Sequence, residues 1–134
     1  MGYNIIMSAV NKNIFKAYDI RGVYSSELDE ETARTIGRTL RKFVFKSNSI
    51  IVGRDVRISS PALYGAVLEG LGAPVQEVGI VTTPMFYFLV KELCASGGIM
   101  ITASHNPAEY NGFKVVNERV EMIGGEEILK LIHS

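Results

Sequence analysis

Hydrophobic residues recur at helical spacing in some segments of this chain and form short apolar runs in others. The two patterns alternate along the chain and predict helices that alternate with strands. The first helical pattern follows Asp29, a residue type that often caps helices, and continues to about Lys46. In the second, we expect Ser60 to act as the N-cap before Pro61 in the first turn, and residues 72–74 to end the helix. The predicted helices cover residues 29–46, 60–71, 83–95 and 126–132.

The strand patterns are short and mostly apolar, which is typical of a sheet that is buried on both faces. They cover residues 49–53, 75–80, 98–102 and 112–116. Strands and helices that alternate with short connections predict an α/β fold, a three-layer α/β/α domain with a mixed, mostly parallel sheet. The sheet is expected to be mixed because Asn111-Gly112 predicts a tight turn and an antiparallel pairing near the end of the chain.

The composition is that of one globular domain: 134 residues, of which 47% are hydrophobic and 21% charged. Lys and Arg (14) balance Asp and Glu (14), so no net field favours nucleic acid or an anionic membrane. The longest apolar run, residues 85–90, is far too short to span a membrane. Cys94 is the only cysteine, which favours a reducing cytoplasm, and its apolar neighbourhood predicts a buried, inert thiol.

The richest candidate chemistry lies in residues 102–115, T-A-S-H-N-P-A-E-Y-N-G-F-K-V, directly after a predicted strand. Ligand sites in open α/β sheets gather beyond the carboxyl ends of strands, which is where Ser104 falls. Asn106, which precedes a proline, favours a fixed turn that would hold Ser104 in one place. Lys114 could steady phosphate charge or act as an acid or base if the chain folds back towards Ser104. On these residues alone, a turn-forming serine, a hairpin turn and a solvated lysine remain open alternatives.

Two further segments carry arginines beside predicted turns. Residues 15–22, F-K-A-Y-D-I-R-G, contain Arg21, whose guanidinium is suited to bind phosphate through two parallel donors. The alternative is a structural turn in which Arg21 pairs with Asp19 while Tyr18 lies in the core. Residues 52–61, V-G-R-D-V-R-I-S-S-P, follow a strand and precede a helix N-terminus, a location suited to anions.

All three segments resemble the α-D-phosphohexomutase family, which includes phosphoglucomutase and phosphomannomutase. The resemblance covers nearly all of the chain and is to the first of four domains. We therefore expect residues 1–134 to form N-terminal domain I, with the later domains absent from this sequence. In the arginine-containing segment 52–61 we expect Asp55 and Arg57 to brace neighbouring loops by charge-assisted bonds and so help to position Ser104.

The resemblance also implies a role for each candidate site residue. Ser104 matches the serine that carries the phosphoryl group, and an oxygen of its phosphate or hydroxyl binds Mg²⁺. Lys114 matches the general acid/base at the sugar hydroxyl, and His105 a residue that shapes the loop or contacts substrate. Tyr18 and Arg21 match residues that reach the catalytic centre and the substrate, where Arg21 holds phosphate charge. His105 is not expected to be the base of a Ser-His pair, since adjacent side chains usually point apart.

The activity implied by the resemblance is the interconversion of hexose 1-phosphate and hexose 6-phosphate. It proceeds through the phosphoserine and a hexose 1,6-bisphosphate intermediate, with a hexose phosphate and the remaining domains as partners. The Y-N-G-F sequence at 110–113 is closer to the glucose/mannose branch than to the glucosamine branch. A phosphoglucosamine mutase domain is the alternative within the fold. If the natural chain ends at Ser134, a non-catalytic phosphosugar-binding domain is the alternative from another class.

Several parts of a complete mutase site have no match in this sequence. The family's D-G-D-x-D-R metal loop, its G-E-x-S-G sugar loop and its C-terminal phosphate-binding loop are missing. Mg²⁺ prefers an octahedral set of oxygen ligands, so we expect the missing carboxylates to come from a later domain. The fragment alone is expected to fold but not to turn over substrate, because this catalysis depends on positioning and charge neutralisation from several sides.

Overall fold

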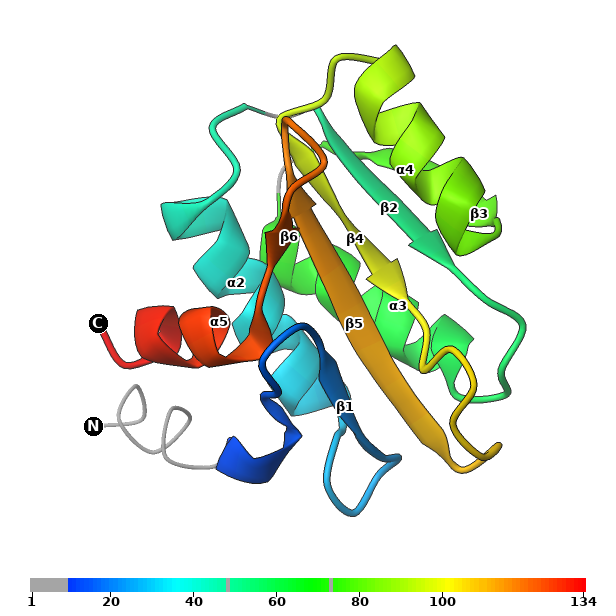
Figure 1. Ribbon diagram of the computed structural model, residues 1–134. Helices are drawn as coiled ribbons and strands as arrows, with labels where there is room; N and C mark the ends of the chain where they lie inside the picture. The colour runs from blue at the N-terminus through cyan, green and yellow to red at the C-terminus, as the bar shows by residue number, and fades with distance from the viewer. Residues whose placement is uncertain (1–9, 48, 73) are drawn as a thin grey trace.

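The computed structural model describes residues 10–47, 49–72 and 74–134. Over these residues the chain forms a mixed sheet of six strands in the order β1-β5-β4-β2-β3, with β6 paired to β5 (Figure 1). The strands are β1 (Ile20–Val23), β2 (Ile50–Arg54), β3 (Gln76–Ile80), β4 (Gly97–Ile101), β5 (Tyr110–Asn117) and β6 (Met122–Ile123). The helices are η1 (Lys12–Ile14), α2 (Glu30–Phe43), α3 (Ser60–Leu71), α4 (Thr83–Glu92) and α5 (Gly125–Ile132). Ala73, in the segment predicted to end the second helix, lies outside the described residues.

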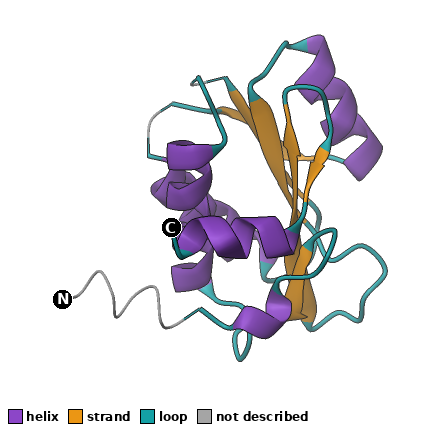
Figure 2. Cartoon of the chain, turned by 60° about the vertical axis from the view of Figure 1, so that its left-hand side comes forward, coloured by secondary structure: helices purple, strands orange, loops and turns teal. Residues whose placement is uncertain are grey.

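The helices cover both faces of the sheet, so the three-layer α/β/α architecture is confirmed (Figure 2). Residues from α2, α3 and α5 pack with one face in the larger core, and residues from α4 pack on the other face in a smaller core. Every residue of β4 is buried, as the apolar strand pattern predicts. Among the described residues, no helix is long and apolar enough to cross a membrane.

The sheet is mixed, as predicted, but it is less parallel than expected. Across the described residues, β2 pairs in parallel with β3 and β4, whereas β5 pairs antiparallel with β1, β4 and β6. The sequence pattern missed β1 and β6 because each is short, with four and two residues, and gains its hydrogen bonds from β5. The parallel part of the sheet therefore ends at β4, and the loop that follows β4, residues 102–109, lies where the strand direction changes.

Asn111-Gly112 does not form the predicted turn. Both residues are buried within β5, where Gly112 lies opposite Arg21 of β1. A Cβ atom on Gly112 would lie 2.0 Å from the carbonyl oxygen of Ile20, so the glycine permits close strand approach. The expected antiparallel pairing does occur between β4 and β5, but the loop that joins them is residues 102–109.

The predicted helix starts are largely confirmed. Asp29 caps α2, since its Oδ1 accepts the N–H of Thr32 at 3.0 Å. The expectation that Ser60 caps α3 is wrong: Ser59 is the N-cap, and the Ser60 hydroxyl donates to Asp55 Oδ1 at 2.6 Å. The Ser60 hydroxyl is therefore not available to cap the helix, because it bonds to the partly buried carboxylate of Asp55.

Two helix ends come earlier than the periodicity predicts. The first helix, α2, ends at Phe43, and α4 ends at Glu92. Beyond α4, Cys94 adopts a left-handed backbone (φ 51°), which terminates the helical run. The prediction of a buried thiol is wrong, because Cys94 is exposed at this helix end, outside the apolar contacts that bury Val90.

Two glycines of α3 give a matched test of the packing between α2 and α3. A Cβ atom at Gly70 would lie 2.2 Å from the backbone oxygen of Arg34, whereas one at Gly65 meets nothing within 4 Å. We expect Gly70→Ala to lower the free energy of unfolding by roughly 3 kcal/mol because the helices must separate. Gly65→Ala is expected to raise it by about 0.5–1 kcal/mol, the usual helix-propensity gain. Urea denaturation measures both, and equal effects of the two variants would contradict this packing.

Candidate active site

The loop between β4 and β5, residues 102–109, projects from the carboxyl end of β4 and presents Ser104 to solvent. Ser104 has a positive φ of 55°, which non-glycine residues rarely adopt. Its N–H donates to Oγ1 of Thr102 at 3.0 Å, and the neighbouring His105 is also exposed. A strained backbone at an exposed hydroxyl is a feature that gathers at functional sites.

Arg57 holds this serine loop in place from the neighbouring segment. Its Nη1 donates to the carbonyl oxygens of Pro107 (2.7 Å) and Tyr110 (3.1 Å). Its Nη2 donates to the carbonyl oxygens of Ser104 (2.9 Å) and Asn106 (2.7 Å). The rigid fork of a guanidinium can meet four carbonyls at once, which an ammonium cannot. The loop conformation that carries Ser104 is therefore fixed largely by one side chain.

Asp55 in turn orients Arg57. Its Oδ2 lies 3.3 Å from Nε of Arg57, while its Oδ1 accepts the Arg57 N–H at 3.0 Å and the Ser60 hydroxyl. Asn111 Nδ2 donates to the hydroxyls of Ser59 (2.8 Å) and Ser60 (3.0 Å), which links β5 to the start of α3. These contacts connect two strand ends and one helix start beneath the serine loop.

Asn106 stabilises the loop from within. Its backbone N–H and its Nδ2 both donate to the carbonyl oxygen of Ala103, at 3.0 and 2.8 Å. Asn106 therefore closes a turn over residues 103–106 that contains Ser104, in agreement with the fixed turn that the sequence predicts. It also lines a polar depression of about 300 Å³ together with Lys16 and Arg21, so the loop and β1 share one surface.

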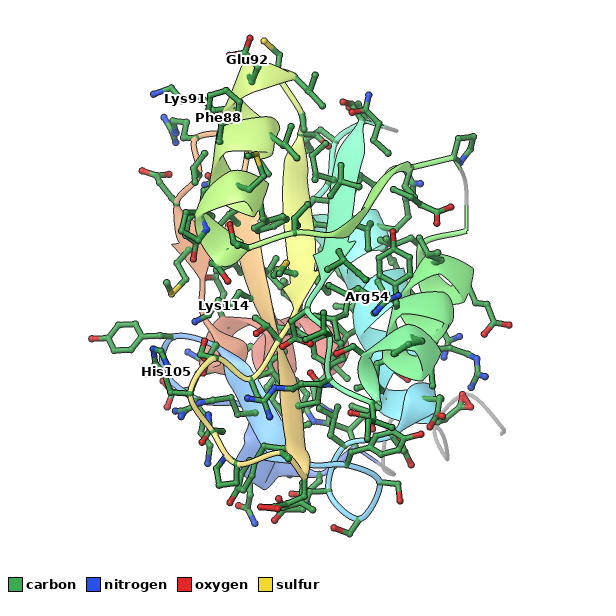
Figure 3. All side chains as sticks on the ribbon, turned by 90° about the vertical axis from the view of Figure 1, so that its right-hand side faces the viewer. Arg54, Phe88, Lys91, Glu92, His105 and Lys114 are labelled. Carbon is green, nitrogen blue, oxygen red and sulfur yellow. The ribbon has the colours of Figure 1, made fainter. Side chains whose placement is uncertain are left out.

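A second group of charges joins β1 to β5. Asp19 lies between two cations: its Oδ1 is 2.9 Å from Nε of Arg21, and its Oδ2 is 3.5 Å from Nζ of Lys114. Lys114 is only 19% exposed, so it is not the freely solvated lysine of the plain alternative. Tyr18 is 73% exposed, so the alternative that placed its ring in the core is wrong, although the Asp19–Arg21 contact is present. Figure 3 shows His105 and Lys114 on the same side of that view.

No pattern along the chain indicates that Asp19 contacts Lys114. Asp19 precedes β1 and Lys114 lies within β5, so only the pairing of these strands brings them together. The sole local signal was the neighbouring Arg21, two positions on, which suggested a turn. The Asp19 carboxylate also influences Tyr87 of α4: burial, and to a smaller extent the negative charge of Asp19, raise the pKa of the Tyr87 phenol above its ordinary value.

In the part of the chain that the structure describes, the acidic residues do not gather into a metal site. The sequence has three aspartates, and all are engaged: Asp19 with cations, Asp29 as a helix cap and Asp55 with Arg57. The described residues contain no group of three or more histidine, cysteine, aspartate or glutamate side chains placed to hold a metal. The oxygen of the exposed Ser104, or of a phosphate upon it, is the donor that this loop offers to a hard cation.

We expect Arg57→Ala to lower the free energy of unfolding by about 3 kcal/mol, because it leaves Asp55 unpaired in a partly buried position and frees four carbonyls. Urea denaturation of the chain measures this loss. Arg119→Ala is the matched control: Arg119 also contacts a carboxylate, Glu121, but is 76% exposed, so its removal should leave the unfolding free energy unchanged within error. Equal effects of the two substitutions would contradict the bracing role of Arg57.

Comparisons with known proteins agree with this fold. Residues 12–133 match the family model described as phosphoglucomutase/phosphomannomutase, alpha/beta/alpha domain I. The fold and the serine loop thus define an α/β/α domain of the domain I type. The chain belongs to the phosphoglucomutase/phosphomannomutase family.

Individual relatives support the same assignment. The chain is 42% identical over 127 residues to a phosphoglucomutase of Neisseria gonorrhoeae, covering 91% of this chain and 26% of that protein. It is 44% identical over 127 residues to a phosphomannomutase of Vibrio cholerae, covering 90% and 27%. A crystal structure of a phosphoglucomutase/phosphomannomutase family protein from Burkholderia thailandensis superimposes with a TM-score of 0.81 at 39% identity, covering 92% and 30%. The chain spans about a quarter of the length of the first two relatives.

Proposed function

We propose that this chain is the phosphoserine-bearing N-terminal domain of an enzyme that interconverts hexose 1-phosphates and hexose 6-phosphates. The observation that carries the proposal is the exposed Ser104, in a left-handed backbone conformation that Arg57 fixes through the surrounding carbonyls. The names of the relatives, phosphoglucomutase and phosphomannomutase, support the reaction and the hexose class. In this proposal residues 1–134 form domain I, and further domains complete the site.

In the proposed reaction, phosphorylated Ser104 gives its phosphoryl group to a sugar hydroxyl. The P–O bond to Ser104 breaks, so that the Ser104 oxygen leaves with the bonding electron pair as an oxyanion, and a P–O bond to the sugar oxygen forms. Nζ of Lys114, as the neutral amine, receives the hydroxyl proton and becomes the ammonium. The resulting hexose 1,6-bisphosphate reorients, and the Ser104 oxyanion attacks its other phosphoryl group. The P–O bond to the sugar breaks, and the Lys114 ammonium gives its proton to the departing sugar oxygen, which restores the neutral amine. The net result is movement of phosphate between positions 1 and 6.

The remaining site residues are proposed to bind and orient the phosphosugar. The guanidinium of Arg21, at 39% exposure, is accessible to neutralise phosphate charge beside Lys114. The exposure of His105 and Tyr18 supports a role for both in substrate contact. Arg57, Asp55 and Asn106 hold the serine loop and do not touch the reacting atoms in this proposal.

Mg²⁺ is the cation proposed for this site. When bound, it would neutralise charge on the transferring phosphate. This chain can supply only part of the ligand set: the Ser104 oxygen can bind Mg²⁺, whereas the three aspartates are engaged in other contacts. Carboxylates from the other domains would complete the ligand set, so the isolated domain is expected to be inactive. We further propose that the enzyme works in the cytoplasm, without nucleic acid or membrane partners.

A mutase assay of the full-length protein tests this function. It uses Mg²⁺, a catalytic amount of hexose 1,6-bisphosphate, and the 1-phosphates of glucose, mannose and glucosamine in parallel. We expect turnover of glucose or mannose 1-phosphate at rates far above that of glucosamine 1-phosphate. Preferential turnover of glucosamine 1-phosphate would reassign the protein to the phosphoglucosamine branch. Phosphosugar binding without turnover of any of the three would favour a non-catalytic domain.

A further inference from the structure

We propose that Asp19 is a positioning residue that holds the Lys114 ammonium in place for proton transfer. The inference rests on the proposed function, because it assigns Lys114 to the sugar hydroxyl. Asp19 itself does not touch the substrate in this account. It acts through Lys114, whose Nζ lies 3.5 Å from its Oδ2.

The backbone that carries the Asp19 carboxylate is itself held in place. Its side chain is 13% exposed, and its carbonyl oxygen accepts the N–H of Lys16 at 2.8 Å. Gly125, at the start of α5, packs so closely that a Cβ atom there would lie 2.4 Å from the backbone carbonyl oxygen of Asp19. A carboxylate fixed by its backbone can orient a flexible lysine side chain, which otherwise samples many rotamers.

The charges around Asp19 make its carboxylate the link between two cations. Arg21 of β1 and Lys114 of β5 both contact it, while the phenol of Tyr87 from α4 also lies within its electrostatic reach. Within residues 10–47, 49–72 and 74–134, Asp19 is the acidic residue that forms ion pairs with both cations. Without it, a guanidinium and an ammonium would be held near one another with no opposite charge between them.

The substitution Asp19→Asn affects the contact with Lys114 differently from the contact with Arg21. An amide oxygen can still accept the Nε–H of Arg21, so that bond can persist. The amide nitrogen then faces the Lys114 ammonium, and two donors oppose each other where an ion pair stood. The variant therefore disturbs Lys114 selectively while it keeps the shape of the side chain.

In the full-length enzyme we expect Asp19→Asn to lower kcat by about 10- to 100-fold, since displacing a reacting group by about 1 Å can cost about 100-fold. KM is expected to change by less than about threefold, as transition-state interactions are lost more than substrate binding. Asp19→Glu, which keeps the charge, should recover part of kcat, and thermal unfolding should match the unsubstituted enzyme. An unchanged kcat, or a loss that follows a fall in Tm, would overturn the proposal.

A double substitution shows whether Asp19 acts through Lys114. If it does, Asp19→Asn combined with Lys114→Ala should be no slower than Lys114→Ala alone, because residues that act as a unit are not additive. Multiplied losses would assign Asp19 an independent role and overturn the proposal.

A readout that needs no mutase activity separates this inference from the proposed function. Competitive labelling of the full-length protein with acetic anhydride measures the reactivity of each lysine. We expect Asp19→Asn to raise labelling of Lys114 by about threefold or more, because an ion-paired ammonium reacts slowly, and to leave the exposed Lys91 of α4 unchanged (Figure 3). Unchanged labelling of Lys114 would overturn the positioning role. Increased labelling in a protein without mutase activity would uphold the Asp19–Lys114 contact and reject the proposed reaction.

Discussion

Ser104→Ala in the full-length enzyme is expected to lower turnover of hexose 1-phosphate by more than about 10³-fold, because it removes the only oxygen of this side chain that can carry the phosphoryl group. The hydroxyl is exposed and its backbone bonds to Thr102 and Arg57 do not involve Oγ. The loop should therefore keep its shape, and thermal unfolding should be unchanged. Coupled assay of hexose 6-phosphate formation measures the loss.

The matched control is Ser26→Ala, which removes another exposed serine hydroxyl, in the segment between β1 and α2. We expect it to retain the turnover of the unsubstituted enzyme. Turnover of Ser104→Ala within about tenfold of that control would mean that another group carries the phosphate, since loss of a covalent carrier costs far more.

Lys114→Ala is expected to lower kcat by roughly 10²- to 10⁴-fold, the usual contribution of a general acid or base. The Lys114 side chain is mostly buried and its ammonium lies 3.5 Å from Asp19, a geometry suited to a directed proton donor and not to a solvated surface charge. Steady-state kinetics with the preferred hexose 1-phosphate measure kcat and KM separately. A change in KM alone would indicate that Lys114 binds phosphate without transferring a proton.

The control for this substitution is Lys91→Ala, which removes an exposed ammonium from the last turn of α4. It should leave both kinetic constants unchanged. Ser104 phosphorylation by the bisphosphate should also be slowed in Lys114→Ala, since the departing sugar oxygen then lacks its acid. Full turnover with an intact fold would remove Lys114 from the acid/base role.

The parts of the fold that depend on local signals could be predicted from the sequence. The N-cap at Asp29 and the start of α4 at Thr83 follow from short-range hydrogen bonds and proline geometry. The buried strand β4 follows from its apolar run. The turn predicted at Asn111-Gly112 was wrong because this dipeptide, which is common in turns, here lies buried within β5, where the glycine permits close approach of β1.

For the candidate site, the sequence predicted residues within single segments but not the contacts between segments. Ser104 could be singled out from its own loop, and the bracing role expected for Arg57 agrees with its contacts. The spacing of residues could not show that the Arg57 guanidinium binds carbonyl oxygens up to 53 positions along the chain. The contact between Asp19 and Lys114 depends on the pairing of β1 with β5, and β1 was too short to be recognised as a strand.

Mapping the phosphorylated residue tests directly whether Ser104 carries the phosphoryl group. The full-length protein is incubated with hexose 1,6-bisphosphate and Mg²⁺, digested, and analysed by mass spectrometry, with Ser104→Ala treated in parallel. We expect phosphate on the peptide that contains residues 102–115, at Ser104, and none in the variant. Phosphate on another residue, or equal labelling of the variant, would contradict it.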